Sequence, residues 1–237
     1  MIQTEGIFVG GSAISAPIIG EDFNWTGGDG TYQVLDDGGG NWRIKLLSSG
    51  TFTPLKNMVI DVFLVGGGGG AGSSYCGEGG AGYTTTVRSI VLTANTAYSI
   101  VVGAAGTNGN PSSAGGETTA FTASAAGGKN TSNGTSSSKR PGGAGGSGGA
   151  GYVSPVATTT GGTDGGDGTS SATTGGKGQG TTTREFGEAD GALYASGGGS
   201  NLSATVANSG NGGRNGITSI APADGIVVIR QHKEVAA

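Results

Sequence analysis

The sequence predicts an all-β fold: a β-sandwich-like framework with glycine-rich loops or polyglycine-II helices inserted between its first and last core strands, and essentially no α-helix. Three observations support this prediction. Short runs rich in β-branched and aromatic residues are separated by turns that contain glycine and asparagine. No segment shows the apolar period of an amphipathic helix. Glycine accounts for 55 of the 237 residues, which is roughly three times its usual share of about 7%.

Residues 1–50 differ from the rest and predict a small N-terminal β unit that serves attachment or oligomerisation, either separate from the following chain or continuous with it. Residues 31–35 and 42–47 have the composition of strands, and the glycine-rich stretch between them is typical of a β-hairpin loop. Both tryptophans, Trp25 and Trp42, lie in this part of the chain. The unit therefore has aromatic residues for its own packing.

Residues 51–230 predict the glycine-rich domain, and residues 231–237 a short tail. An apolar strand at 59–65 leads directly into five glycines, and an aliphatic strand at 226–229 ends the domain at Arg230. A strand of this kind at the end of a low-complexity stretch needs a partner to be buried, and 59–65 is the best one. We therefore expect the first and last strands of this domain to pair, with the glycine-rich middle folded between them. Further strands are expected at 83–92, 97–102 and 118–124.

The glycine clusters show a period of three. Residues 142–151 read G-G-A-G-G-S-G-G-A-G, which suits a helix of the polyproline-II type, with 3 residues per turn and a rise of about 3.1 Å. An isolated helix of that type has no internal hydrogen bonds. If such runs are ordered, neighbouring runs must satisfy one another's backbone groups laterally. Further clusters occur at 127–128, 161–168, 175–180, 197–199 and 210–216.

Composition excludes several classes of function. The formal net charge is −4, and the longest basic run is Lys139-Arg140, so we expect no nucleic-acid partner. Cys76 is the only cysteine, which excludes an intrachain disulfide and a multi-cysteine zinc site. No run approaches the roughly 20 apolar residues of a membrane span, so we expect no membrane insertion. Residues 1–10 lack the pattern of a secretory signal.

Glycine abundance produces motif matches that lack the required context. Gly77-x-Gly79-x-x-Gly82 fits the dinucleotide fingerprint, but β-branched residues follow it where the fingerprint requires a helix. Gly145-x-Ser147-x-Gly149 fits a nucleophile elbow without its strand-to-helix turn. The only histidine, His232, lies in the tail. We therefore expect no enzyme, no catalytic residue and no cofactor.

Two aspartates leave one metal alternative open. Asp164 and Asp167 lie in a stretch similar to one copy of the calcium-binding nonapeptide repeat. The copy does not recur with a period of nine, and one copy cannot build a β-roll. We expect no metal site, with a single structural Ca²⁺ as the alternative.

The spacers between glycine clusters hold the side chains suited to contacting a partner. Aromatic rings can stack on sugar faces, and arginine donates to hydroxyl or anionic groups. Residues 181–194 form the spacer that most resembles ordinary protein. An alternative role for Phe186, Leu193 and Tyr194 is to anchor this loop in the core, and the same alternative is open for Tyr152. The candidate receptor-binding residues are Tyr75, Arg140, Tyr152, Arg184, Phe186, Tyr194 and Arg214.

Four segments in order carry a family resemblance. Residues 50–55, 60–70, 98–106 and 225–230 together resemble the glycine-rich domain of phage and prophage tail-fibre proteins. The chain is also similar, more loosely, to the tail-fibre tip adhesins of T-even-like phages, in which polyglycine-II helices pack together and the loops recognise the host. The resemblance implies a virion location, a bacterial surface glycan or protein as receptor, and other tail-fibre or baseplate proteins as partners. It leaves a monomer and a homotrimer open. Residues 1–50 are unlike the fibre-docking region of those adhesins.

Three functions are weighed on this basis. The leading hypothesis is a tail-fibre adhesin that binds the host through loops on a rigid scaffold. The main alternative is a non-enzymatic structural fibre or virion decoration component. A polysaccharide depolymerase would need paired carboxylates in a cleft, for which only Glu185, Glu188 and Asp190 cluster.

Overall fold

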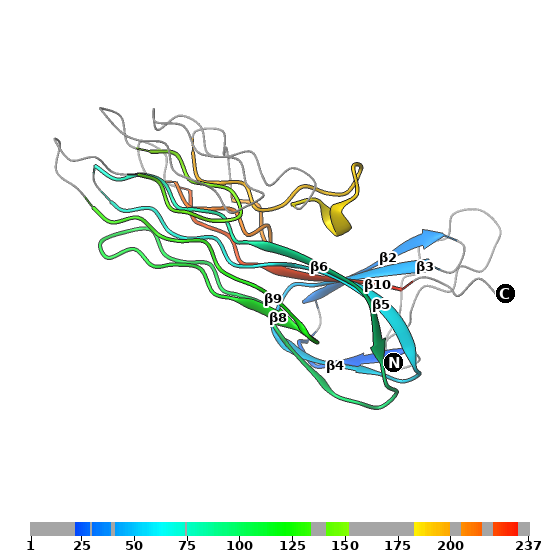
Figure 1. Ribbon diagram of the computed structural model, residues 1–237. Helices are drawn as coiled ribbons and strands as arrows, with labels where there is room; N and C mark the ends of the chain where they lie inside the picture. The colour runs from blue at the N-terminus through cyan, green and yellow to red at the C-terminus, as the bar shows by residue number, and fades with distance from the viewer. Residues whose placement is uncertain are drawn as a thin grey trace.

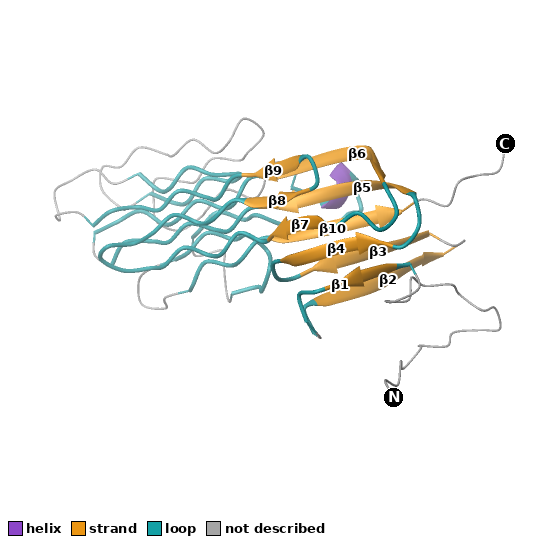
Figure 2. Ribbon diagram, turned by 90° about the horizontal axis from the view of Figure 1, so that it is seen from below, coloured by secondary structure: helices purple, strands orange, loops and turns teal. Residues whose placement is uncertain are grey.

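The computed structural model describes residues 22–28, 30–38, 41–73, 75–133, 141–151, 183–199, 205–214 and 220–231. Two five-stranded antiparallel sheets pack face to face at one end, and extended glycine-rich runs continue from them to the other end (Figures 1 and 2). The described residues contain no α-helix, only the short 3-10 helix η1 (Glu185–Gly187). The predicted all-β, sandwich-like class is confirmed.

Each sheet mixes strands from distant parts of the chain. The first sheet has the order β1-β4-β7-β8-β9 and the second β2-β3-β10-β5-β6. In chain order the strands are β1 (Phe23–Trp25), β2 (Tyr32–Gly38), β3 (Asn41–Leu46), β4 (Gly50–Pro54), β5 (Met58–Val65), β6 (Thr84–Leu92), β7 (Tyr98–Val101), β8 (Thr118–Ala120), β9 (Ala123–Ala125) and β10 (Ile226–Gln231).

Alternate residues of the strands fill the space between the two sheets. On β3, Trp42, Ile44 and Leu46 point inward and are buried, while the residues between them face the other side. Phe23 and Phe52 stack across the first sheet with ring centroids 5.1 Å apart. Inward-facing residues of β5, β6, β7 and β10 complete this core.

The two central strands of the second sheet are buried on both faces, which explains their continuous apolar sequences. Phe63, Val65 and Val228 point away from the sandwich interior and belong to a second core cluster. The segment 183–195, which includes η1, covers them. β5 and β10 pair in register from Val65↔Ile226 to Ile60↔Gln231, so the predicted pairing of the first and last strands of the glycine-rich region is confirmed.

The sheets are continuous across residue 50. β1 pairs with β4, and β3 pairs with β10. The expected hairpin is present as β2–β3. The N-terminal unit could be separate from the following chain or continuous with it. Residues 23–46 share both sheets with later strands, so their hydrogen bonding is continuous with the rest of the chain.

The glycine-rich runs form a hydrogen-bonded lattice with a period of three. Run 66–71 leaves β5 and is surrounded by other runs. Its carbonyls accept from further runs, for example Gly67 from Gly128 (2.9 Å). The three-residue repeat of partners is that of packed polyglycine-II helices. The N–H groups of Gly66 and Gly69 donate to run 80–83, those of Gly67 and Gly70 to run 113–116, and that of Gly68 to Ala223.

Glycine is required in this lattice because the backbones approach too closely for a side chain. A Cβ atom added at Gly68 would lie 1.8 Å from the carbonyl oxygen of Asn211. Run 78–83, which leads into β6, donates with the same period of three to three further neighbours. The lattice thus extends two adjacent strands of the second sheet, β5 and the edge strand β6, outward from the sandwich. Within the described residues, no helix is long and apolar enough to cross a membrane.

Candidate functional site

The outer end of the lattice is the part of the molecule where the described runs turn back. We call it the distal loop end and define it as residues 71–73, 75–76, 107–113, 130–133, 214 and 220. Figure 1 shows several lattice runs turning back at the end of the molecule opposite the sandwich. The turns come from five separate stretches of chain, which only the lattice brings together.

Both described ends of the chain lie away from the distal loop end. β10 enters the second sheet at Ile226, beside the lattice, and leaves it at Gln231, paired with Ile60 near the start of β5. Asp22 accepts a hydrogen bond from the backbone N–H of Leu55, in the β4–β5 connection (2.9 Å). An attachment through either end would leave the distal loops facing outward.

Asn108 connects three of the distal turns. Its side-chain oxygen accepts from the backbone N–H of Ala71 (2.8 Å). Its side-chain nitrogen donates to the carbonyls of Arg214 (3.0 Å) and Ile220 (2.9 Å). Arg214 and Ile220 also exchange backbone hydrogen bonds. A single half-buried amide therefore fixes the relative positions of these turns.

Other short polar side chains fasten the remaining turns. The Asn133 side chain accepts from the backbone N–H of Ser73 and donates to its hydroxyl. The Asn130 side chain donates to the carbonyl of Ser112 (2.9 Å). Thr131 is buried and bridges two stretches, since its hydroxyl accepts from the N–H of Gly72 and donates to the carbonyl of Gly77. The distal loop end is thus pre-ordered by its own hydrogen bonds.

Apart from Pro111, the exposed side chains described at the distal loop end are polar, with one aromatic ring. Tyr75 is 45% exposed, and Ser73, Asn110, Asn130 and Ser132 are exposed. Such groups can exchange hydrogen bonds with hydroxyl or peptide groups, and the ring offers a face for stacking. This composition suits binding through hydrogen bonds and ring stacking.

The predicted contact residues fall into four groups, of which the buried pair Phe186 and Tyr194 is described separately below. Tyr75 and the half-buried Arg214 lie at the distal loop end. Arg184 lies far from it, in the segment over the second sheet, and donates to the carbonyl of Gly191 (2.9 Å). Arg140 and Tyr152 fall outside the described residues, as do Asp164, Asp167 and His232.

Phe186 and Tyr194 are core residues, which corrects their placement among surface contacts. Phe186 is 2% exposed and Tyr194 8%, because both rings pack on Phe63 of β5, with centroids 6.2 and 5.5 Å away. The anchoring alternative therefore applies to these two residues. It does not apply to Leu193, which is 48% exposed.

A network of ion pairs fixes the segment 183–195 to the second sheet. The carboxylate of Glu185 is 1% exposed and bonds Arg43 (2.6 Å) and Lys45 (3.1 Å) of β3. Burial lowers the pKa of Lys45, but its hydrogen bond to Tyr194 and the charge of Glu185 outweigh burial, so the pKa is raised. Burial raises the pKa of Tyr194.

A second group of ion pairs lies beside the first. Arg230 of β10 bonds Glu188 (2.5 Å) and Asp61 (3.0 Å), and its guanidinium lies 4.1 Å from the centre of the Phe186 ring. Of the carboxylates considered for a depolymerase, Glu185 and Glu188 are thus held in ion pairs. No group of three or more potential metal ligands is found among the described residues.

The residues that organise the distal loop end were missed by the sequence reasoning. Asn108, Thr131 and Asn133 act through backbone hydrogen bonds rather than through a motif. Their only signal is an amide or β-branched hydroxyl residue directly beyond a glycine-rich run.

Comparison with known proteins identifies a glycine-rich domain. A family model described as a glycine-rich domain matches residues 47–230. The match therefore spans all the strands from β4 to β10 and every described glycine run. No curated protein matches the chain.

Proposed function

The chain belongs to the glycine-rich domain family, and on this basis we propose that it is a receptor-binding adhesin of a phage or prophage tail fibre. The proposed partner is a glycan or protein on the bacterial surface, and the distal loop end is the proposed contact surface. In this proposal the protein is not an enzyme. It acts from the virion, outside the host cell.

The observation that carries the proposal is the position of the distal loop end relative to the rest of the molecule. A lattice of mutually hydrogen-bonded runs holds turns from five stretches of chain at the end opposite the described termini. A binding site gains affinity when its loops are ordered in advance, because less entropy is lost on binding. The lattice bonds join backbone atoms, so changes of exposed turn side chains such as Tyr75 do not remove them.

The tail-fibre assignment draws on the order of the four segments that resemble tail-fibre glycine-rich domains. All four fall at structurally defined places. Residues 50–55 contain β4, residues 60–70 join β5 to the lattice, residues 98–106 contain β7, and residues 225–230 contain most of β10. Attachment to other fibre or baseplate proteins through the sandwich end would present the distal loop end to the cell.

The test is adsorption of the fluorescently labelled protein to a panel of bacterial strains. In one variant, Ser73→Arg and Ser132→Arg place two long charged side chains at the distal loop end. The matched control is Ser99→Arg, on β7 of the sandwich, where the residue is also exposed. We expect wild type to adsorb to some strains only, the distal variant to lose adsorption, and the control to keep it.

Two results would contradict the proposal. Uniform absence of adsorption by the folded wild-type protein would favour a structural fibre or decoration component. Adsorption that the distal variant retains would remove the distal loop end as the contact surface.

A further inference from the structure

The side of the sandwich carries a hollow that the proposed function does not use. We propose that it is a second binding site, separate from the distal loop end, and that it takes an uncharged oligosaccharide. The hollow, which we call the lateral trough, runs between the outer face of β2–β3 and residues 188–194.

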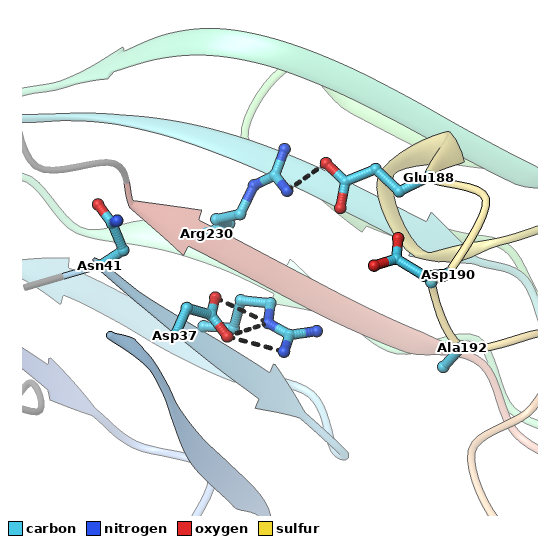
Figure 3. A pocket seen from close by; sticks show the side chains of 8 residues that line it. Asp37, Asn41, Glu188, Asp190, Ala192 and Arg230 are labelled. Atoms are coloured by element: carbon cyan, nitrogen blue, oxygen red, sulfur yellow. Dashed lines mark hydrogen bonds and ion pairs between the residues drawn. The ribbon is translucent and has the colours of Figure 1, made fainter. Parts of the chain in front are cut away.

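The lateral trough consists of two adjoining cavities that share Ala192 in their walls. One has a volume of about 300 Å³ and the other about 310 Å³. Each reaches the lower end of the range for small-molecule sites, roughly 300–1,000 Å³. Figure 3 shows the first, with Asp37 and Asn41 on the strands facing Glu188 and Asp190 on the covering segment.

The trough exists because the second sheet is only partly covered. The segment with η1 packs on β5 and β10 through Phe186 and Tyr194, and its far side ends above β3. The outward residues of β2 and β3 therefore form the floor of the trough, and residues 188–194 form its wall. These floor residues include Gln33, Asp37, Asn41, Arg43 and Lys45.

The charged side chains of the first cavity are held in place by further partners. Arg43 bonds Asp37 within the cavity wall (2.7 Å) and also the buried Glu185 (2.6 Å). Arg230 is held by Glu188, by Asp61 and by the Phe186 ring. These side chains need little reordering when a ligand arrives, which lowers the entropic cost of binding.

The pairing of these charges selects the ligand class. Both arginines are already neutralised by carboxylates, and the five charged lining residues, Asp37, Arg43, Glu188, Asp190 and Arg230, sum to −1. An anion would have to displace a carboxylate from its arginine, and a cation would have to displace an arginine from every lining carboxylate except the exposed Asp190. A hydroxyl group displaces neither, because it can accept from a guanidinium and donate to the adjacent carboxylate. Several hydroxyls on a ring match several such positions.

The second cavity supplies an apolar wall. Leu193 is 48% exposed and Val206 58%, and both line this cavity beside Lys45 and Asn208. Sugar rings combine hydroxyl edges with less polar C–H faces, so a linear oligosaccharide can use both cavities. The two adjoining cavities favour a ligand of more than one ring.

The experiment is a titration of the isotope-labelled protein by two-dimensional NMR. Its probes are maltohexaose, laminarihexaose, a mannan hexasaccharide, an oligogalacturonate and a chitosan oligomer, each at millimolar concentration. The variants are Asp190→Ala and Leu193→Ser. Their matched controls are Glu117→Ala, at an exposed carboxylate near the lattice, and Val91→Ser, at a valine 72% exposed on β6.

We expect at least one neutral hexasaccharide to shift amide signals of residues 41–43, 188–194 and 206–208. Loss of one charge-assisted hydrogen bond in Asp190→Ala should weaken binding about ten-fold, and the controls should bind as wild type. Three results would overturn the proposal: no shifts with any neutral sugar, stronger binding of a charged oligomer, or trough variants that bind normally. The variant with Ser73→Arg and Ser132→Arg should bind the sugar as wild type does. The proposal for the lateral trough is therefore tested independently of the proposal for the distal loop end.

Discussion

Gly68→Ala tests whether the glycine lattice is ordered and contributes to the stability of the fold. Gly68 lies in the run that leaves β5, and an added Cβ would meet the Asn211 carbonyl oxygen at 1.8 Å. The contacting atoms are backbone on both sides, so no side chain can rotate away. The clash must therefore be relieved by separating two runs of the lattice.

The expected loss of stability follows from the bonds involved. Overpacking a close-packed site costs about 1–3 kcal/mol. Separation also weakens the bonds from Gly68 to Ala223 (2.9 Å) and from Gly106 to Gly68 (2.8 Å), worth about 1 kcal/mol each. The lower conformational entropy of unfolded alanine returns about 0.4–1 kcal/mol. We expect a net loss of roughly 2–4 kcal/mol in the free energy of unfolding.

Gly116→Ala is the matched control. Gly116 lies in a neighbouring run, is half-buried, and an added Cβ would meet its nearest atom, the Ala104 nitrogen, at 3.0 Å. Small backbone shifts relieve such a contact, so the loss should stay below about 1 kcal/mol.

The assay combines urea unfolding, followed by the fluorescence of Trp25 and Trp42, with amide hydrogen exchange of residues 66–71. The tryptophans lie in the sandwich, and exchange reports the lattice directly. Equal losses in the two variants would refute the reasoning. So would exchange of wild-type residues 66–71 as fast as that of exposed loops.

Three further predictions concern the segment that covers the second sheet, with Val91→Ala as their shared control because Val91 is 72% exposed on β6. Glu185→Ala should lower the free energy of unfolding by about 2–4 kcal/mol in urea, because Lys45 loses its carboxylate partner and Arg43 keeps only Asp37. A loss equal to the control would contradict this. Phe63→Ala should cost about 3–5 kcal/mol by opening a cavity under the segment, measured in the same way. The pKa values of Lys45 and Tyr194 are higher in the folded than in the unfolded state, so the folded state keeps these protons to higher pH. The free energy of unfolding should therefore stay constant up to about pH 10 and decrease above it. Tyr194→Phe should make this decrease smaller, and a pH profile equal to that of wild type would contradict the prediction.

Much of the fold could be predicted because most strands carry a local signal. β1 and β4 were not predicted, and the single strand expected at 118–124 is the two strands β8 and β9. The alternation of Trp42, Ile44 and Leu46 with polar residues marks a strand with one buried face. The continuous apolar run of β5 marks a strand buried on both faces. The period of three in the glycine runs predicts extended helices that need lateral partners, because a single such helix makes no bonds of its own.

The candidate site was predicted less well, because exposure depends on contacts that the sequence does not state. Tyr75 was correctly expected at the surface, whereas Phe186 and Tyr194 are buried. Nothing local distinguishes Tyr194 from its exposed neighbour Leu193. The difference arises because one side chain points toward Phe63 of β5, more than a hundred positions earlier in the chain.

The sequence by itself determined the all-β class, the positions of most of the strands and the need for a glycine lattice, since these follow from local composition and period. Tertiary structure alone decided which runs are neighbours, that residues 183–195 fold back over the second sheet, and which turns meet at the distal loop end. Lattice neighbours differ little in sequence, so backbone hydrogen bonds between near-identical runs carry no recognisable code. Which runs become neighbours is decided by the packing of the whole domain around the paired strands β5 and β10.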